Sequence, residues 1–256
     1  MKQEERLYFL IKYLINEPEN YLDINIPEDI ADQKPLLRAL MNIRPPKGAS
    51  EKFIRIQNEY LQTEINKKGI TDQYELTPAY DRLFIWQGDI TTLKCGAIVN
   101  AANRSMRGCF VPCHGCIDNA IHTYAGIQLR QECDDIMNKQ GHEELEGQAK
   151  ITRAYNLPCD YIIHTVGPVI RGAVTKKDRE TLRSCYIESL KKAEQYNIKS
   201  IAFCCISTGE FHFPNEEAAR IAVSTVREYL KNSDMERVIF NVFKDEDRKI
   251  YEKLLG

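Results

Sequence analysis

The alternation of strand-like and helix-like segments from Leu76 onward constrains the fold of this chain more than any other feature. Short runs rich in β-branched or aromatic residues alternate with longer amphipathic segments. Such alternation predicts an α/β domain, a sheet covered by helices on both faces. The run at residues 201–206 is nearly all apolar, which is typical of a central strand buried on both sides. The expected strands lie at residues 82–87, 97–100, 148–155, 161–165, 200–206 and 237–242, and the expected helices at residues 118–138, 178–196, 214–232 and 246–255.

The first 75 residues have a different pattern. Apolar residues recur at helical spacing over residues 4–15, 28–43 and 50–67, and no strand or chemical motif is evident. We therefore expect a helical N-terminal extension over residues 1–75 that packs as a cap on a main domain over residues 76–256.

Composition and charge argue against several classes of protein. The chain has 256 residues, 43% of them hydrophobic, which is ample for an α/β domain with an extension. A net charge of -2 argues against nucleic acid as the main partner. The first apolar run, residues 7–15, is interrupted by Lys12 and is too short to span a membrane. With nine cysteines and no export signal, we expect a cytoplasmic protein without a disulfide framework or a membrane partner.

Polar side chains follow the first two expected strands. Asp89 comes directly after residues 82–87, and Asn100 and Asn103 lie at the end of the next strand. Ligands of open α/β sheets bind at such strand ends. The amides suit ribose hydroxyls, and Asp89 could accept a hydrogen bond from an exocyclic amine. Taken alone, each residue favours a local role, in which Asp89 caps a turn and the asparagines satisfy loop backbone.

A second loop, Ile206–Pro214, connects an expected strand to an expected helix. Its small residues would let backbone amides approach a ligand, and the N-terminus of the following helix suits a phosphate. No Gly-Lys-Ser/Thr sequence follows, so this is not a Walker loop. Phe211 could pack on a sugar or be a buried aromatic at the helix start.

A third loop concentrates soft metal ligands. Cys109, Cys113, His114 and Cys116 fall within eight residues. Thiolate and imidazole are the ligands that zinc prefers. Four ligands would close the site, whereas three would leave a position for water or substrate. The alternative is a set of thiols without function.

These motifs together resemble a macrodomain. They are Gly88-Asp89-Ile90, Val99-Asn100-Ala101-Ala102-Asn103, Cys116-Ile117-Asp118-Asn119-Ala120-Ile121-His122 and Ser207-Thr208-Gly209, and their order and spacing cover residues 81 to 256. The resemblance implies a three-layer α/β/α fold with a central mixed sheet and a pocket for ADP-ribose. It also marks His212 as a departure, because many macrodomains have glycine there.

The cysteine loop is similar to that of the zinc-containing macrodomains of bacteria and fungi, which also carry a helical N-terminal extension. That similarity implies one Zn²⁺ held by Cys109, His114 and Cys116, with Cys113 at a variable position. Three ligands form the open arrangement and favour catalysis.

The resemblance further implies a role for each site residue. Asp89 and the Ile90 backbone would bind adenine, and Asn100 and Asn103 would hold the distal ribose. Asp118, with Asn103 orienting the ribose, would position or activate water for hydrolysis. The pyrophosphate and distal ribose would be wrapped by Ser207, Thr208, Gly209, Glu210 and Phe211.

The implied function is zinc-dependent removal of mono-ADP-ribose from modified protein. Some members of the class are linked to a sirtuin-type ADP-ribosyltransferase and a lipoyl-carrier protein, which suggests that carrier as a substrate. The main alternative is a non-catalytic ADP-ribose reader whose pocket is shaped by zinc. Weaker alternatives are a nucleic-acid-binding zinc protein and a phosphatase acting on ADP-ribose phosphate.

The sequence leaves the roles of two histidines undecided. His122 lies four residues after Asp118 on the same helix face, either near the site or in the core. His164, at the end of a strand, is expected to be structural.

Overall fold

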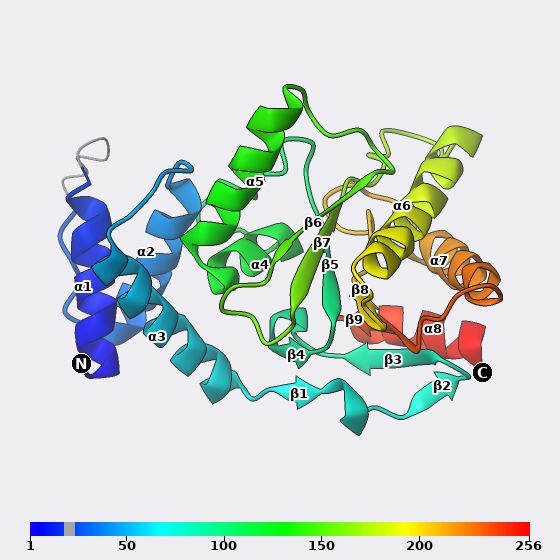
Figure 1. Ribbon diagram of the computed structural model, residues 1–256, viewed down its shortest axis with the longest axis horizontal. Coiled ribbons are helices and arrows are strands. Elements are labelled where there is room, and N and C mark those ends of the chain that lie inside the picture. Colours follow the sequence, from blue (N-terminus) through cyan, green and yellow to red (C-terminus); the bar gives the residue numbers. More distant parts are fainter. Residues whose placement is uncertain (18–23) are drawn as a thin grey trace.

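The computed structural model describes residues 1–17 and 24–256 and has a central seven-stranded sheet (Figure 1). The strand order is β2-β3-β9-β8-β5-β7-β6, with β2 and β6 antiparallel to their neighbours and the other pairs parallel. The expected mixed sheet is confirmed. The strands are β2 Pro78–Tyr80, β3 Leu83–Gln87, β5 Ala97–Ala101, β6 Ala149–Arg153, β7 Tyr161–Thr165, β8 Ser200–Phe203 and β9 Arg237–Val242.

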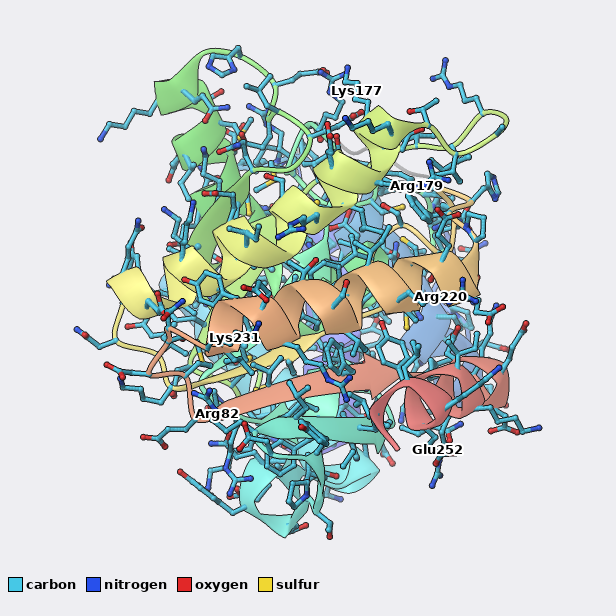
Figure 2. The ribbon with its side chains drawn as sticks, turned by 90° about the vertical axis from the view of Figure 1, so that its right-hand side faces the viewer. Arg82, Lys177, Arg179, Arg220, Lys231 and Glu252 are labelled. Atoms are coloured by element: carbon cyan, nitrogen blue, oxygen red, sulfur yellow. The ribbon has the colours of Figure 1, made fainter. Side chains whose placement is uncertain are left out.

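Helices cover both faces of this sheet, as the three-layer prediction requires. On one face lie α4 (Ile117–Ala125) and α5 (Ile127–Gln140), and on the other lie α6 (Lys176–Gln195), α7 (Asn215–Leu230) and α8 (Asp245–Leu255). Figure 2 looks onto the second group, whose charged side chains, such as Arg179 and Arg220, point away from the sheet.

The expectation of one helix over residues 118–138 is wrong, because Gly126 divides this segment into α4 and α5. Its φ of 97° lies in the left-handed region, which favours glycine. Its N–H donates to the carbonyl of His122, which closes α4. The chain then turns and starts α5 at Ile127.

Three helices precede the sheet: α1 (Gln3–Ile15), α2 (Ile30–Ile43) and α3 (Glu51–Lys68). The Ser50 hydroxyl caps α3 by accepting from the Phe53 N–H. The helices bury a separate apolar cluster, which includes Leu10 and Phe53 and is joined by Ile127 of α5. They lie to one side of the sheet, beside α4 and α5 (Figure 1).

A short strand pair joins this extension to the rest of the chain. β1 (Thr71–Asp72) pairs in parallel with β4 (Leu93–Lys94). The expectation that no strand precedes Leu76 is therefore wrong, since two residues are too few to show a strand periodicity. Within residues 1–17 and 24–256, no helix has the length and apolar character needed to cross a membrane.

Candidate functional site

Two loops leave the same edge of the sheet and meet. β5 and β8 are parallel neighbours, so the segments after their carboxyl ends, residues 102–116 and 204–214, start side by side. They approach each other where Glu210 Oε1 lies 3.7 Å from His114 Nε2. The Cys/His loop and the expected phosphate loop thus belong to one site, at a strand-end position typical of ligand binding in α/β sheets.

Asp118, in the first turn of α4, is the most perturbed carboxyl group of this site. Its side chain is almost fully buried and accepts from Asn100 Nδ2 at 2.8 Å and from Asn103 Nδ2 at 3.3 Å. Burial raises the pKa of Asp118 to about 6, although Asn100 and Arg130 act to lower it. A carboxyl group with a pKa close to neutral suits a general base.

The two asparagines predicted to hold the ribose lie on either side of Asp118. Asn100 is fully buried, and its Oδ1 has no hydrogen-bond partner among the described residues. Asn103 is half-buried; its Oδ1 accepts from the Ser105 N–H and hydroxyl, and its Nδ2 also donates to the Gly108 carbonyl. Asn100 is therefore turned toward the carboxylate, while Asn103 also shapes the start of the Cys/His loop. Direct ribose contact by either side chain stays a prediction.

His122 and His164, whose roles the sequence left undecided, both lie in the interior behind Asp118. His122 Nε2 is 3.6 Å from Asp118 Oδ1, and neither ring nitrogen makes a hydrogen bond in the part of the chain described. His164 contacts Asn100 Nδ2 at 3.1 Å and Thr152 Oγ1 at 2.8 Å. Burial lowers the pKa of His164 to about 3 and that of His122 well below its usual range, so both rings are neutral at pH 7.

The three residues predicted to bind metal are brought together. The ligand atoms of Cys109, His114 and Cys116 all lie within 4.8 Å of one another, and Cys109 Sγ is 3.7 Å from His114 Nδ1. Tetrahedral zinc with usual bond lengths would separate a sulfur and a nitrogen ligand by about 3.6 Å. All three side chains are half-buried. The donor set therefore fits a three-ligand zinc site.

Cys113 lies apart from this group. Its side chain is exposed, and its Sγ contacts the Pro35 carbonyl at 3.3 Å. A second set of possible ligand atoms, on His122, Cys133 and His164, lies in the buried interior, but both nitrogens of His164 already contact protein groups.

The expected phosphate loop has left-handed backbone at Ser207 and at His212, with φ of 65° and 57°. The Ser207 hydroxyl is buried without a hydrogen-bond partner in the described chain, while the Phe213 N–H donates to the Ser207 carbonyl. Phe213 is the buried aromatic residue at the start of α7. Phe211 is partly exposed, and its carbonyl accepts a hydrogen bond from the Ile170 N–H. This leaves Phe211 available to a ligand, together with Thr208 and Gly209.

Asp89 caps a turn and is also exposed enough to bind a ligand. It caps a short 3-10 turn, Ile90–Thr92, by accepting from the Thr91 N–H and hydroxyl. Its other oxygen accepts from Lys68 Nζ at 2.8 Å, and this ammonium also lies 3.5 Å from the Tyr124 ring centre. Asp89 is still 38% exposed, so adenine binding stays a prediction.

Comparison with known proteins identifies the family. The Macro domain family model matches residues 99–222. The structure of an Oceanobacillus iheyensis macrodomain with ADP is 36% identical, with a TM-score of 0.64, over 70% of this chain and 93% of that one. This chain belongs to the macrodomain family.

Two further relatives bear on the function of this macrodomain. A Treponema medium protein named protein-ADP-ribose hydrolase is 53% identical over 261 residues, which is 100% of both chains. A Trypanosoma brucei macrodomain solved in complex with ADP-ribose is 28% identical, with a TM-score of 0.67, over 85% of this chain and 95% of that one.

Several polar residues at the site of this macrodomain were not found from the sequence. Lys68, Arg38 and Asn42 come from the N-terminal extension, and Arg130 comes from α5. Each looks like an ordinary polar position on an amphipathic helix. Only packing of the extension against the Asp89 turn and the Cys/His loop gives them a role, and no local pattern signals that packing.

Proposed function

We propose that this chain is a zinc-dependent hydrolase that removes mono-ADP-ribose from modified protein side chains. The observation that carries this proposal is the position of Asp118, a buried carboxyl group with a raised pKa. It follows Cys116 by two residues, and Cys116 is one of the three predicted metal ligands, with Cys109 and His114. A base near neutral pKa beside an open metal site is an arrangement suited to hydrolysis. The 53% identical relative named protein-ADP-ribose hydrolase supports it.

The binding part of the proposal assigns the two ends of ADP-ribose. Asp89 and Ile90 would hold the adenine, and Asn100 and Asn103 would hold the distal ribose. Backbone amides and side chains of residues 207–211 would wrap the pyrophosphate and distal ribose. The macrodomains solved with ADP and with ADP-ribose support a ligand of this chemistry.

In the reaction, water attacks the anomeric carbon of the distal ribose and the bond from that carbon to the protein side chain breaks. Asp118 orients the water and takes one of its protons, and this proton then passes to the side-chain atom that leaves the anomeric carbon. Asn100 and Asn103 hold the Asp118 carboxylate in place through their amides. When bound to Cys109, His114 and Cys116, zinc would act as a Lewis acid for negative charge that develops at the distal ribose.

We further propose that the substrate is a mono-ADP-ribosylated protein of the cytoplasm, with a lipoyl-carrier protein modified by a sirtuin-type transferase as the first to test. This step depends on the similarity of the Cys/His loop to that of the zinc-containing class.

The test compares wild type, Cys116→Ala and Asp118→Ala for metal content, ADP-ribose affinity and release of ADP-ribose from modified protein. We expect Cys116→Ala to lose both metal and activity. Asp118→Ala should keep the metal and lose at least about 100-fold in rate, the usual contribution of a general base. Full activity in thoroughly chelated wild type would contradict the zinc-dependent mechanism.

The same assay separates hydrolysis from simple binding. A reader whose pocket is shaped by zinc would bind ADP-ribose as wild type, would bind it more weakly after Cys116→Ala, and would release none from modified protein in any of the three proteins. Such a result would leave the binding assignments intact and remove the catalytic roles of Asp118 and Asn103.

A further inference from the structure

Helix α2 of the N-terminal extension lies against the outer side of the Cys/His loop. Arg38 donates through Nη2 to the His114 carbonyl at 2.8 Å. The same guanidinium donates from Nη2 and Nε to Asn119 Oδ1 at 2.7 and 3.1 Å. Asn119 in turn donates from Nδ2 to the Val111 carbonyl at 3.0 Å. Arg38 thus fixes the backbone of one predicted ligand directly and the middle of the loop through Asn119.

A second residue of α2 holds the loop at Cys113. The Cys113 N–H donates to Asn42 Oδ1 at 2.9 Å, and Asn42 Nδ2 donates to Thr123 Oγ1 at 2.9 Å. Asn42 is almost fully buried. Cys113 has a φ of 53°, so the loop makes its left-handed turn where Asn42 accepts this bond. Asn42 therefore ties the turn between two predicted ligands to α4.

A third contact joins the end of α2 to the start of the loop. The buried guanidinium of Arg130 donates from Nη2 to the Cys109 carbonyl at 3.3 Å. Its Nη1 donates to the carbonyls of Asn42 and Arg44, both at 2.6 Å. The Phe110 ring packs over this guanidinium, with its centre 4.1 Å away. Arg130 thus links the C-terminal end of α2 to the first predicted ligand.

These contacts act on the loop backbone at Cys109, Cys113 and His114, between and at the ligand positions. The loop itself contains glycine and proline and has no helix or strand until α4 begins at Ile117. A metal site needs its ligands held close to bonding geometry, and loss of a group that orients a ligand typically costs 10- to 100-fold in metal affinity. If the extension were only a cap, its polar contacts would not need to converge on this loop.

We propose that α2 positions the metal ligands, with Arg38 and Asn42 as positioning residues that hold the Cys/His loop in its ligand geometry. This rests on the proposed zinc site at Cys109, His114 and Cys116. It gives the N-terminal extension a role in metal binding.

The experiment measures Zn²⁺ affinity of the full chain by competition with a chromophoric chelator. Arg38→Met keeps the aliphatic stem and removes all three donations. We expect its Zn²⁺ affinity to fall on the order of 10-fold. Arg38→Lys, with a compact ammonium in place of the planar fork, should fall less. The matched control is Arg6→Met on α1, which breaks an ion pair with Glu59 of α3 and no bond to the loop, and which should leave the affinity unchanged.

Asn42→Ala is the second variant, and urea unfolding of the metal-free proteins is the second measurement. An affinity loss in Arg38→Met and Asn42→Ala that exceeds any loss in Arg6→Met, at matched metal-free stability, supports the positioning role. Wild-type affinity within about twofold in both variants overturns it, while the zinc site stands. A wild type that takes up no zinc, or the same amount after Cys116→Ala, sinks the zinc site and this inference with it.

Discussion

At the scale of single residues, Asp118 shows how the site trades stability for chemistry. Its carboxylate is buried, and the two amide donations from Asn100 and Asn103 do not fully replace the lost water. The result is a pKa of about 6 in the folded chain, against an ordinary value of 3.8. Below pH 3.8 the carboxyl is protonated in both states and costs nothing. As the pH rises from about 4 to about 6, ionisation favours the unfolded chain, and the cost persists above that range.

We therefore expect Asp118→Asn to be more stable than wild type, and more so at high pH. Each unit of pKa shift corresponds to about 1.4 kcal/mol, so the gain in free energy of unfolding at pH 8 is on the order of 3 kcal/mol. It should be about 1.4 kcal/mol smaller at pH 5, where the carboxyl of the folded wild type is mostly protonated. Urea unfolding of the metal-free proteins at both pH values checks this. A gain that does not change between the two would contradict it.

His212 is a second residue whose backbone carries a cost. It has a φ of 57° in an exposed position. The left-handed region costs a residue with a side chain roughly 1–2 kcal/mol, partly offset by the larger chain entropy that glycine loses on folding. We expect His212→Gly to match or exceed wild-type stability by up to about 1 kcal/mol.

The matched substitution is His212→Val, because β-branched residues tolerate this region worst. It should lose about 1 kcal/mol or more. Chemical denaturation gives the order of stability, and a valine variant as stable as the glycine variant would show that the loop does not require this backbone conformation.

At the scale of elements, α4 and α5 show what the sequence can and cannot predict. The strands could be predicted because a short apolar run such as Ile201–Phe203 is typical of a strand that is buried on both faces. The break at Gly126 could not be predicted from periodicity. Ile121, Ala125 and Leu129 are all buried and continue one helical pattern across it, because both helices pack in the same layer.

Gly126→Ala tests this break. The backbone φ of 97° is unfavourable for alanine, and a Cβ there would lie 2.6 Å from Gln57 Nε2. We expect a loss of about 1–3 kcal/mol in the free energy of unfolding. The control is Gly172→Ala, where nothing lies within 4 Å of an added Cβ. It should change stability by less than about 0.5 kcal/mol. Equal effects at the two positions would count against the assigned role of Gly126.

The candidate site divides in the same way. The strand-end motifs at Asn100, Asn103 and Ser207 could be found from the sequence, because parallel strands bring their carboxyl ends to one edge. The contact of Asn100 with His164 depends on the register between β5 and β7, which places the two residues opposite each other. The hold of Arg38 on the Cys/His loop depends on how the extension docks. Both are long-range consequences of packing.

At the scale of the whole molecule, two apolar cores meet at Ile65 and Ile127, and polar groups join the helical extension to the Cys/His loop. The helical extension has its own core. Arg38 donates to the Cys/His loop, Asn42 accepts from it, and the buried Arg130 donates to carbonyls of both. Burial lowers the pKa of Arg130 to about 10, so it stays charged at pH 7 and needs its backbone carbonyl partners. The site therefore lies where the two cores depend on each other.

The titratable groups buried behind this site make the free energy of unfolding of the whole chain depend on pH. His164 and His122 have pKa values lowered by burial, so below pH 6.5 the unfolded chain binds protons that the folded chain does not. Asp118 acts in the opposite direction, since the folded chain binds its proton first. With two histidines against one carboxyl, stability must fall on acidification.

For the metal-free protein we expect the free energy of unfolding to drop by about 2 kcal/mol between pH 6.5 and pH 5 from these three groups. Removing the metal keeps protonation of the predicted ligands from adding to the effect. His164→Gln supplies polar atoms for Asn100 and Thr152 without a titratable ring, so its drop should shrink to less than about 1 kcal/mol. Urea unfolding at the two pH values measures both slopes. If the two proteins lose the same free energy of unfolding between these pH values, the pKa of His164 is the same in the folded and the unfolded chain, and burial does not keep its ring neutral.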